Sequence, residues 1–95
     1  MIDVKIRKEA IKIIGHADCA PKGKDVVCAA VSILAQNLIK SINDLTEDKI
    51  EYWIDDGEID IQYKDLSEKA MLLVDSFFIG ISWIAETYPD YVQLS

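Results

Sequence analysis

Residues 49–64 read KIEYWIDDGEIDIQYK, a pattern that places β-structure in the middle of this 95-residue chain. Apolar side chains alternate with polar ones over residues 49–54 and again over residues 58–64, which is typical of strands with one buried face. Asp55, Asp56 and Gly57 separate the two runs, and an Asp-Gly pair favours a tight turn. The pattern therefore predicts an antiparallel β-hairpin.

A second hairpin is predicted at the N-terminus. Residues 2–7 and 11–14 alternate more crudely between apolar and charged side chains, with a short turn between them. The second of these strands leads directly into Gly15 and His16. Residues 17–24 follow without periodicity and contain proline and glycine, so we expect an irregular loop there.

Residues 26–42, VVCAAVSILAQNLIKSI, predict a helix that begins beside Asp25. Asp25 has the chemistry of an N-cap, because its carboxylate can accept a hydrogen bond from a backbone N–H two or three residues further on. Cys28 falls in the first turn. The apolar residues cover more than one narrow stripe, so we expect the helix to be largely buried: they are Val26, Ala29, Ala30, Ile33, Leu34 and Leu38.

Residues 67–86 predict a second helix, with Ser67 as a plausible cap. Pro89 should end it, and residues 90–94 are expected to add a short final strand at the sheet edge. Further apolar residues flank the predicted core face, and either the sheet or a second copy of the chain could cover them. The core face itself carries Ala70, Val74, Phe77, Ile81 and Ile84.

Together these elements predict an α+β fold of two layers, in which two helices pack on a mostly antiparallel β-sheet. A chain of 95 residues, 51% of them hydrophobic, has room for a single domain over residues 1–95 with one modest core. Small cores are often helped by pairing with a second copy, so we expect a homodimer.

The net charge of the chain indicates which binding partners to expect, and its first residues indicate the cellular compartment. The formal net charge of -7 repels phosphate backbones, which argues against direct nucleic-acid binding and favours a basic peptide partner. The opening MIDVKIRKEA has no apolar signal-peptide core, so a cytoplasmic location is expected. Charged and small residues interrupt the apolar run 70–85, and we therefore expect no membrane anchor.

The run GHADCAPKGKDVVCAAVS, residues 15–32, carries the chemistry. It places His16 at a predicted strand end and Cys28 at a predicted helix start. A thiolate is the reactive form of cysteine; the positive end of a helix stabilises it, and a nearby imidazole can take its proton. The alternative is a small buried cysteine and a structural histidine, although residues at element ends are more often functional.

This run closely resembles the signature of the ribosomal-processing cysteine protease Prp family, in the segments 15–17, 23–25 and 27–32. The resemblance implies that His16 is the general base and Cys28 the nucleophile, with Asp25 and Ser32 as supporting residues. It also implies a homodimer that removes a short N-terminal extension from bacterial large-subunit ribosomal protein twenty-seven. The expected cut follows aromatic residues just ahead of a basic segment.

The supporting residues each have two interpretations. Ser32 lies one helical turn after Cys28 on the same face, where it could contact substrate or imidazole, or bond only to its own helix. Asp25 as a cap would fix the helix start, but its charge opposes the thiolate, so we expect mainly a structural role. Gly15 and Gly23 could be loop hinges with positive φ, or ordinary turn glycines.

The sequence gives less support to a metal site, a redox site or a noncatalytic binding site. Cys19, Cys28 and His16 lack zinc-site spacing, and neither a metal nor a cofactor is expected. Cys19 is interpreted as an incidental thiol; a reversible bond to Cys28 would instead make the chain a thiol redox protein. A noncatalytic module that binds a ribosomal peptide is the other alternative. The aromatic residues Tyr52, Trp53 and Tyr63 could line an aromatic-accepting groove or simply pack across strands.

Overall fold

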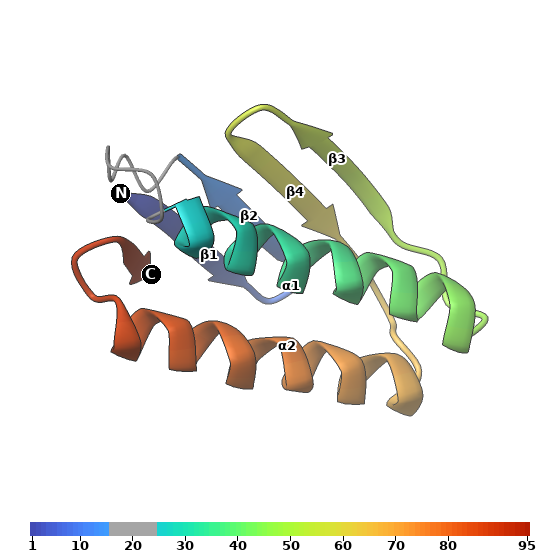
Figure 1. Ribbon diagram of the computed structural model, residues 1–95. Coiled ribbons are helices and arrows are strands. Elements are labelled where there is room, and N and C mark those ends of the chain that lie inside the picture. The colour runs from blue at the N-terminus through green and yellow to red at the C-terminus, as the bar shows by residue number, and fades with distance from the viewer. Residues whose placement is uncertain (16–24) are drawn as a thin grey trace.

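The computed structural model describes residues 1–15 and 25–95, and of Asp25 only the backbone. Within these residues, seven elements follow one another (Figure 1). Their bounds are β1 Ile2–Arg7, β2 Ala10–Ile14, α1 Asp25–Leu45, β3 Glu51–Asp55, β4 Glu58–Gln62, α2 Glu68–Thr87 and β5 Val92–Leu94. Both predicted hairpins, both helices and the short final strand are therefore present.

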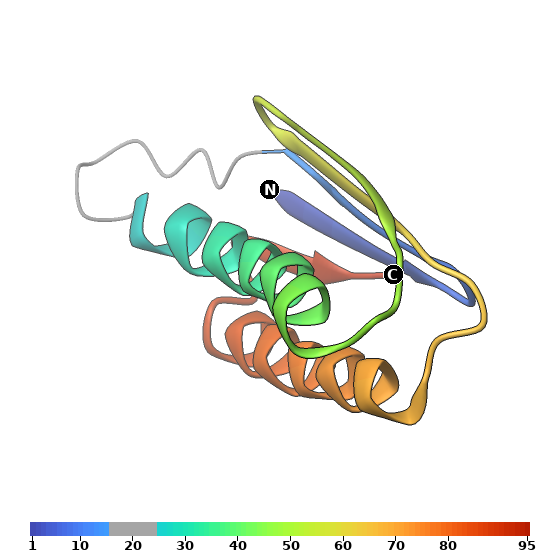
Figure 2. The same ribbon diagram turned by 90° about the vertical axis from the view of Figure 1, so that its right-hand side faces the viewer.

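The strands form one sheet in the order β3-β4-β2-β1-β5. All neighbours are antiparallel except β1 and β5, which run parallel and pair Ile2 with Val92. The two helices lie side by side on one face of the sheet (Figures 1 and 2). This is the predicted two-layer α+β fold, and the chain end returns to the sheet edge beside the first strand.

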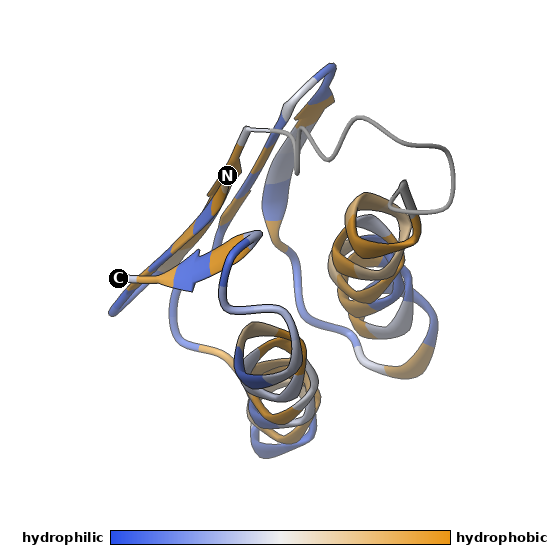
Figure 3. Ribbon diagram, turned by 60° about the vertical axis from the view of Figure 1, so that its left-hand side comes forward, coloured by the Kyte–Doolittle hydropathy of each residue, from blue (hydrophilic) through white to orange (hydrophobic). Residues whose placement is uncertain are grey.

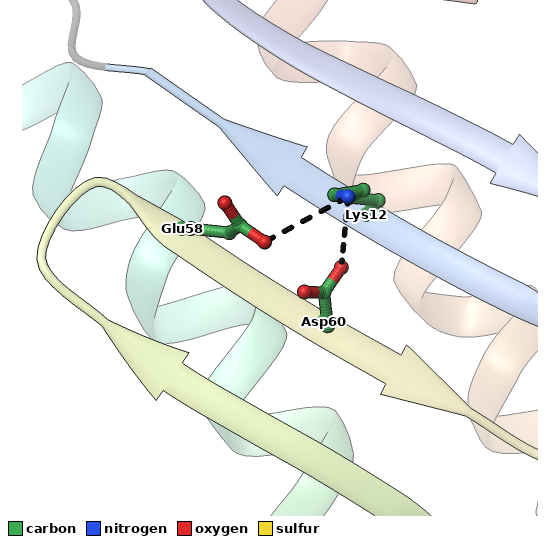
Figure 4. A network of polar contacts seen from close by, with 3 residues as sticks. All are labelled: Lys12, Glu58 and Asp60. Carbon is green, nitrogen blue, oxygen red and sulfur yellow. Dashed lines mark ion pairs between the residues drawn. The ribbon is translucent and has the colours of Figure 1, made fainter.

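The core lies between the sheet and the helices. Alternate strand residues point into it and are buried, which follows from the two-residue period of a strand. The opposite face of the sheet is polar, and there Lys12 lies 3.8 Å from Glu58 and 4.0 Å from Asp60 (Figure 4). Exposed ion pairs of this kind contribute little to stability. The buried strand residues are Ile2, Val4, Ile11, Ile13, Ile59, Ile61 and Val92.

The predicted burial of the first helix is wrong in detail. Val26 and Ile33, which we expected inside, are exposed, as is Ala29. The helix is apolar on most of its circumference, so its sequence does not fix which stripe faces the sheet. One stripe packs on the sheet and the opposite side remains outside. The buried residues of α1 are Val27, Val31, Ala35, Leu38, Ile39 and Ile42.

The second helix begins as predicted. The Ser67 hydroxyl accepts a hydrogen bond from the Ala70 N–H at 3.2 Å and donates one to Asp48 at 2.6 Å. Asp48 also accepts the Ser67 N–H at 2.7 Å, and these bonds hold the pKa of its carboxyl below the usual value. The predicted core face Ala70, Val74, Phe77 and Ile81 is buried, and Ile84 is half-buried.

Both helices also keep apolar residues on their outer sides (Figure 3). On length and composition alone, Val26–Leu45 and Glu68–Thr87 could each cross a membrane. Core helices of soluble proteins share that composition, and here each helix packs one stripe on the sheet. The outer apolar residues of α2 include Met71, Leu72, Ile79 and Trp83.

Candidate active site

The end of strand β2 is tied to the tip of the β3–β4 hairpin. The Gly15 N–H donates to the Gly57 carbonyl at 2.8 Å, one step beyond the last β2–β4 pair. Gly15 has a φ of 106°, and a Cβ there would overlap the carbonyl oxygen of Met1. Both properties require glycine. The positive φ suggested by the sequence is present at the residue that precedes His16.

Cys28 lies in the first turn of α1 and is half-buried. Its neighbour Val27 belongs to the core, which fixes the rotation of the helix and leaves Cys28 in the wall of a cavity beside the hairpin tip. This cavity of about 230 Å³ separates the helix from that tip. Cys28 and Ser32 form its helix wall, and Gly15 forms part of its sheet wall. The fold thus brings together residues from three distant parts of the sequence.

Ser32 lies on the same helix face as Cys28, as its spacing predicts, and lines the same cavity. Its hydroxyl oxygen accepts a hydrogen bond from Gln36 Nε2 at 2.8 Å. The bond comes from a side chain one turn further along, so it orients the hydroxyl without joining it to the helix backbone. Because the oxygen is the acceptor, the hydroxyl hydrogen is the group that Ser32 can offer to a ligand.

The hairpin tip beside the cavity is acidic, which the sequence analysis did not anticipate. Asp55, Asp56 and Glu58 border the cavity. Asp55 and Glu58 pair across the hairpin, and their side chains project to the sheet face away from the helices, where Glu58 meets Lys12. Their carboxylates therefore do not face Cys28. The Asp56 N–H donates to Asp55 Oδ1 at 2.8 Å, which keeps the Asp55 carboxylate in the turn. A hydrogen bond and the charge of Asp60 raise the pKa of Glu58, and Lys12 opposes this shift. The DDGE run was visible in the sequence, but only the pairing of β4 with β2 places it beside the cavity of Cys28.

The rest of the cavity is apolar. Its lining includes Ile2, Ile13, Val31, Ile54 and Ile59. Within the part of the chain described, none of the three aromatic residues suggested as a groove lines it, although Ile54 is their neighbour in β3. Such a space, apolar and next to an acidic hairpin tip, suits an apolar side chain next to a basic one.

The three aromatic residues lie in different environments. Tyr52 and Trp53 are about half exposed on β3, on opposite faces of the sheet. Tyr63 follows β4 and packs against the core, where burial and, to a smaller degree, the charge of Asp75 raise its pKa. Of the two roles suggested for Tyr63, groove lining and packing, the structure thus supports packing.

Several predicted site residues lie outside the described residues. These are His16, Cys19 and Gly23, together with the side chain of Asp25. The helix begins at Asp25 itself, one residue earlier than the cap assignment predicts. Within residues 1–15 and 25–95, no group of three or more His, Cys, Asp and Glu side chains is placed to hold a metal ion. The pairing of His16 with Cys28 stays a prediction.

Residues 1–93 match the family model described as cysteine protease Prp. The chain belongs to the Prp family. It is 26% identical over 101 residues to the ribosomal processing cysteine protease Prp of Staphylococcus aureus, covering 99% of this chain and 95% of that protein. The corresponding protein of Mycoplasma genitalium is 27% identical over 97 residues, covering 100% of this chain and 95% of that one.

Solved structures agree with this Prp assignment. The S. aureus Prp protease in complex with a covalently linked product peptide has a TM-score of 0.85 and 25% identity, covering 99% of this chain and 95% of that one. A protein of Streptococcus mutans has a TM-score of 0.83 and 32% identity, covering 99% and 90%. The predicted family, fold and enzyme class are thereby confirmed: this Prp chain is a cysteine protease.

Proposed function

We propose that this Prp protease removes the N-terminal extension of bacterial large-subunit ribosomal protein twenty-seven, cutting after an aromatic motif. The observation that carries the proposal is the place of Cys28, at the start of α1 and in the wall of a cavity lined by apolar and acidic residues. The S. aureus protease with its covalently linked product peptide supports a peptide as the substrate.

The mechanism follows from a Cys and His pair at a helix start. His16 accepts the thiol proton, and the Cys28 thiolate attacks the carbonyl carbon of the scissile bond. Backbone N–H groups in the first turn of α1 stabilise the oxyanion that forms. His16 then protonates the leaving amine, and water hydrolyses the thioester to release the acyl product and regenerate the thiol. No cofactor takes part.

Ser32 and Asp25 support this chemistry. The hydrogen bond from Gln36 points the Ser32 hydroxyl hydrogen away from the amide that donates it, and Ser32 shares the cavity with Cys28. It is therefore suited to bind a carbonyl of the substrate or to orient His16. Asp25, at the first residue of α1, would hold the helix start in place. Gly15 and Gly23 would serve as the hinges of the segment between them.

The chemistry of the cavity supports the choice of substrate. Ile13, Val31 and Ile54 offer an apolar surface for an aromatic side chain. The hairpin tip that borders the cavity carries Asp55, Asp56 and Glu58, and its negative charge favours a lysine or arginine nearby. The net charge of -7 acts in the same direction at longer range. An aromatic motif followed by basic residues matches the apolar cavity and the acidic tip beside it.

The test is mass spectrometry of a peptide with a Phe-Phe pair followed by basic residues, incubated with wild type and with Cys28→Ala. We expect one cut after the aromatic pair in wild type and none in Cys28→Ala. Cys19→Ser is the matched thiol control and should keep full activity; loss of activity there would support the redox alternative. Binding without cutting by wild type would support the noncatalytic module.

We also propose that the protein works in the cytoplasm as a homodimer. The support for pairing is the outer side of α2, where Leu72, Ile79 and Trp83 are 70%, 73% and 72% exposed. Their spacing puts all three on one stripe of the helix. Large apolar side chains gathered on one exposed stripe are typical of interaction surfaces.

A further inference from the structure

The hydrogen-bond alternation of the sheet determines which way the backbone of β3 points. Gly15 N–H bonds to the Gly57 carbonyl at 2.8 Å, and Tyr63 N–H bonds to the Glu9 carbonyl at 3.0 Å. In an antiparallel strand successive residues bond to opposite sides. The odd-numbered residues of β4 therefore bond to β2, and its even-numbered residues bond to β3.

The even-numbered residues of β4 pair with Glu51, Trp53 and Asp55. Those three residues of β3 therefore use their N–H and carbonyl groups within the hairpin. Tyr52 and Ile54 alternate with them, so their backbone groups point out of the sheet. Because β3 is the outermost strand, no described strand lies on that side.

The helix-facing side of β3 is also uncovered. Tyr52 and Ile54 project to the same face as the buried Ile59 and Ile61 opposite them in β4. Yet Tyr52 is 51% and Ile54 50% exposed, whereas their partners in β4 are buried. The helix layer thus covers β4 and stops short of β3. The strand offers both a row of backbone groups and an open apolar surface beside it.

This open strand is continuous with the site of the thiol. Ile54 lines the same cavity as Cys28 and Ser32. We infer that the substrate peptide binds to the edge of β3 as an added β-strand, with its backbone bonded to Tyr52 and Ile54 and one end at Cys28. The inference rests on the proposed function and adds to it the way the substrate is held. Backbone pairing of this kind gives affinity for an extended chain, and side chains then give specificity.

Charge favours a peptide over a second copy of this chain as the occupant. All charged residues of β3 and its turn, Glu51, Asp55 and Asp56, are acidic. If two β3 strands paired about a two-fold axis at Trp53, Glu51 would face Asp55 of the other copy, and like charges in opposite positions destabilise a sheet. A peptide with basic residues would instead place positive charges opposite these acidic side chains, which stabilises the pairing. The edge is therefore better suited to the substrate than to self-association.

The test uses the peptide with a Phe-Phe pair and basic residues, N-methylated at one backbone amide at a time. N-methylation removes a donor without changing a side chain. Because only alternate residues of an added strand bond to its neighbour, kcat/KM should fall about tenfold at every second amide and change little between them. Equal effects at successive amides would overturn the inference.

Variants of the strand provide the complementary test. Ile54→Pro removes an outward N–H and leaves the β3–β4 bonds in place, which an edge strand tolerates. Ile54→Ala is the matched control, since it removes the side chain and keeps the N–H. We expect Ile54→Pro to have a several-fold lower kcat/KM than Ile54→Ala at an unchanged oligomeric state. If Ile54→Pro instead converts a dimer into a monomer, the edge belongs to a second copy and the inference is wrong.

Binding of the same N-methylated series to Cys28→Ala separates this inference from the proposed function. Alternating losses of affinity without any cutting by wild type would support the added strand and contradict the proposed function. Cutting by wild type, together with losses of affinity that do not alternate along the series, would support the proposed function and contradict the added strand. If wild type does not cut the parent peptide and Cys28→Ala does not bind it, both are overturned.

Discussion

Gly15 directly follows β2 and Gly57 directly precedes β4, two strands that the sequence separates by a whole helix, and the backbones of these glycines meet in a hydrogen bond of 2.8 Å. The bond fixes the end of β2 against the tip of the β3–β4 hairpin. His16 follows the first of these glycines, and the acidic residues Asp56 and Glu58 flank the second. One register of the sheet therefore positions both the chain that leads to the predicted base and the hairpin tip that borders the cavity of Cys28.

Gly15→Ala should destabilise the protein and reduce its activity. Its φ of 106° is strained for any other residue, and the new methyl group would overlap the Met1 carbonyl. Strain of this kind costs about 1–3 kcal/mol. Thermal unfolding and peptide cleavage measure the two effects.

Gly80→Ala is the control for Gly15→Ala. Gly80 lies within α2, and a Cβ there would approach only the end of the flexible Leu34 side chain, at 3.1 Å. The better helix propensity of alanine offsets this close contact. A loss of stability in Gly80→Ala as large as in Gly15→Ala would contradict the explanation from positive φ.

Asp48→Asn should lower the stability at neutral pH, and the difference from wild type should shrink in acid. Hydrogen bonds from Ser67 lower the pKa of Asp48 from its usual 3.8. A carboxyl whose folded pKa is depressed adds stability above its unfolded value, and that stability is lost as the pH falls through the folded value. Chemical denaturation at several pH values from neutral to about 2 measures the difference.

Two controls accompany this pH series. Ser67→Ala removes the helix cap together with the hydroxyl bond to Asp48, keeps the backbone N–H bond, and should cost about 1 kcal/mol. Glu47→Gln changes the same charge at a neighbouring exposed position and should not alter the pH dependence of stability in the same way. A constant difference between Asp48→Asn and wild type across this range would show that the Asp48 charge is not the cause.

The parts of the fold that could be predicted from the sequence are those that local patterns determine. Alternation and the Asp-Gly turn identify β3 and β4, and the Ser67 cap identifies the start of α2. The rotation of α1 escaped prediction because apolar residues surround most of that helix. Val26 and Val27 are chemically identical neighbours, yet one is exposed and the other buried, since only the position of the sheet distinguishes them.

In the candidate site, too, only the features that depend on local spacing could be predicted. Cys28 and Ser32 could be placed on one helix face from their spacing alone. The acidic hairpin tip could not be assigned to the site, because its distance from Cys28 depends on the long-range pairing of β2 with β4. The edge position of β3 likewise depends on the strand order, which local alternation does not reveal.

Ile79→Glu should convert the proposed dimer into a monomer. Ile79 lies between Leu72 and Trp83 on the exposed stripe of α2, and a charge buried in an apolar interface without a partner is strongly unfavourable. Sedimentation velocity measures the change. Leu45→Glu is the matched control, because Leu45 is 65% exposed at the far end of α1. If both variants remain dimeric, the interface lies elsewhere.

Glu58→Gln should stabilise the protein at neutral pH and weaken its action on basic peptides. The Asp60 hydrogen bond and charge raise the pKa of Glu58 above its usual 4.5. A carboxyl with a raised folded pKa adds stability below its unfolded value, and that stability is lost as the pH rises through the folded value, so the ionised form opposes folding at neutral pH. The gain from glutamine should therefore disappear in acid, as denaturation at neutral pH and below about 4 will measure.

The same substitution removes one charge from the hairpin tip that borders the cavity. The Glu58 carboxylate lies on the sheet face away from the helices and acts on a basic peptide through space, so kcat/KM for such a peptide should fall by up to about fivefold. Salt should reduce the difference from wild type, because it screens the interaction. Glu86→Gln makes the same charge change at the exposed end of α2 and should leave kcat/KM nearly unchanged. Equal losses in the two variants would mean that net charge, and not the acidic hairpin tip, attracts the substrate.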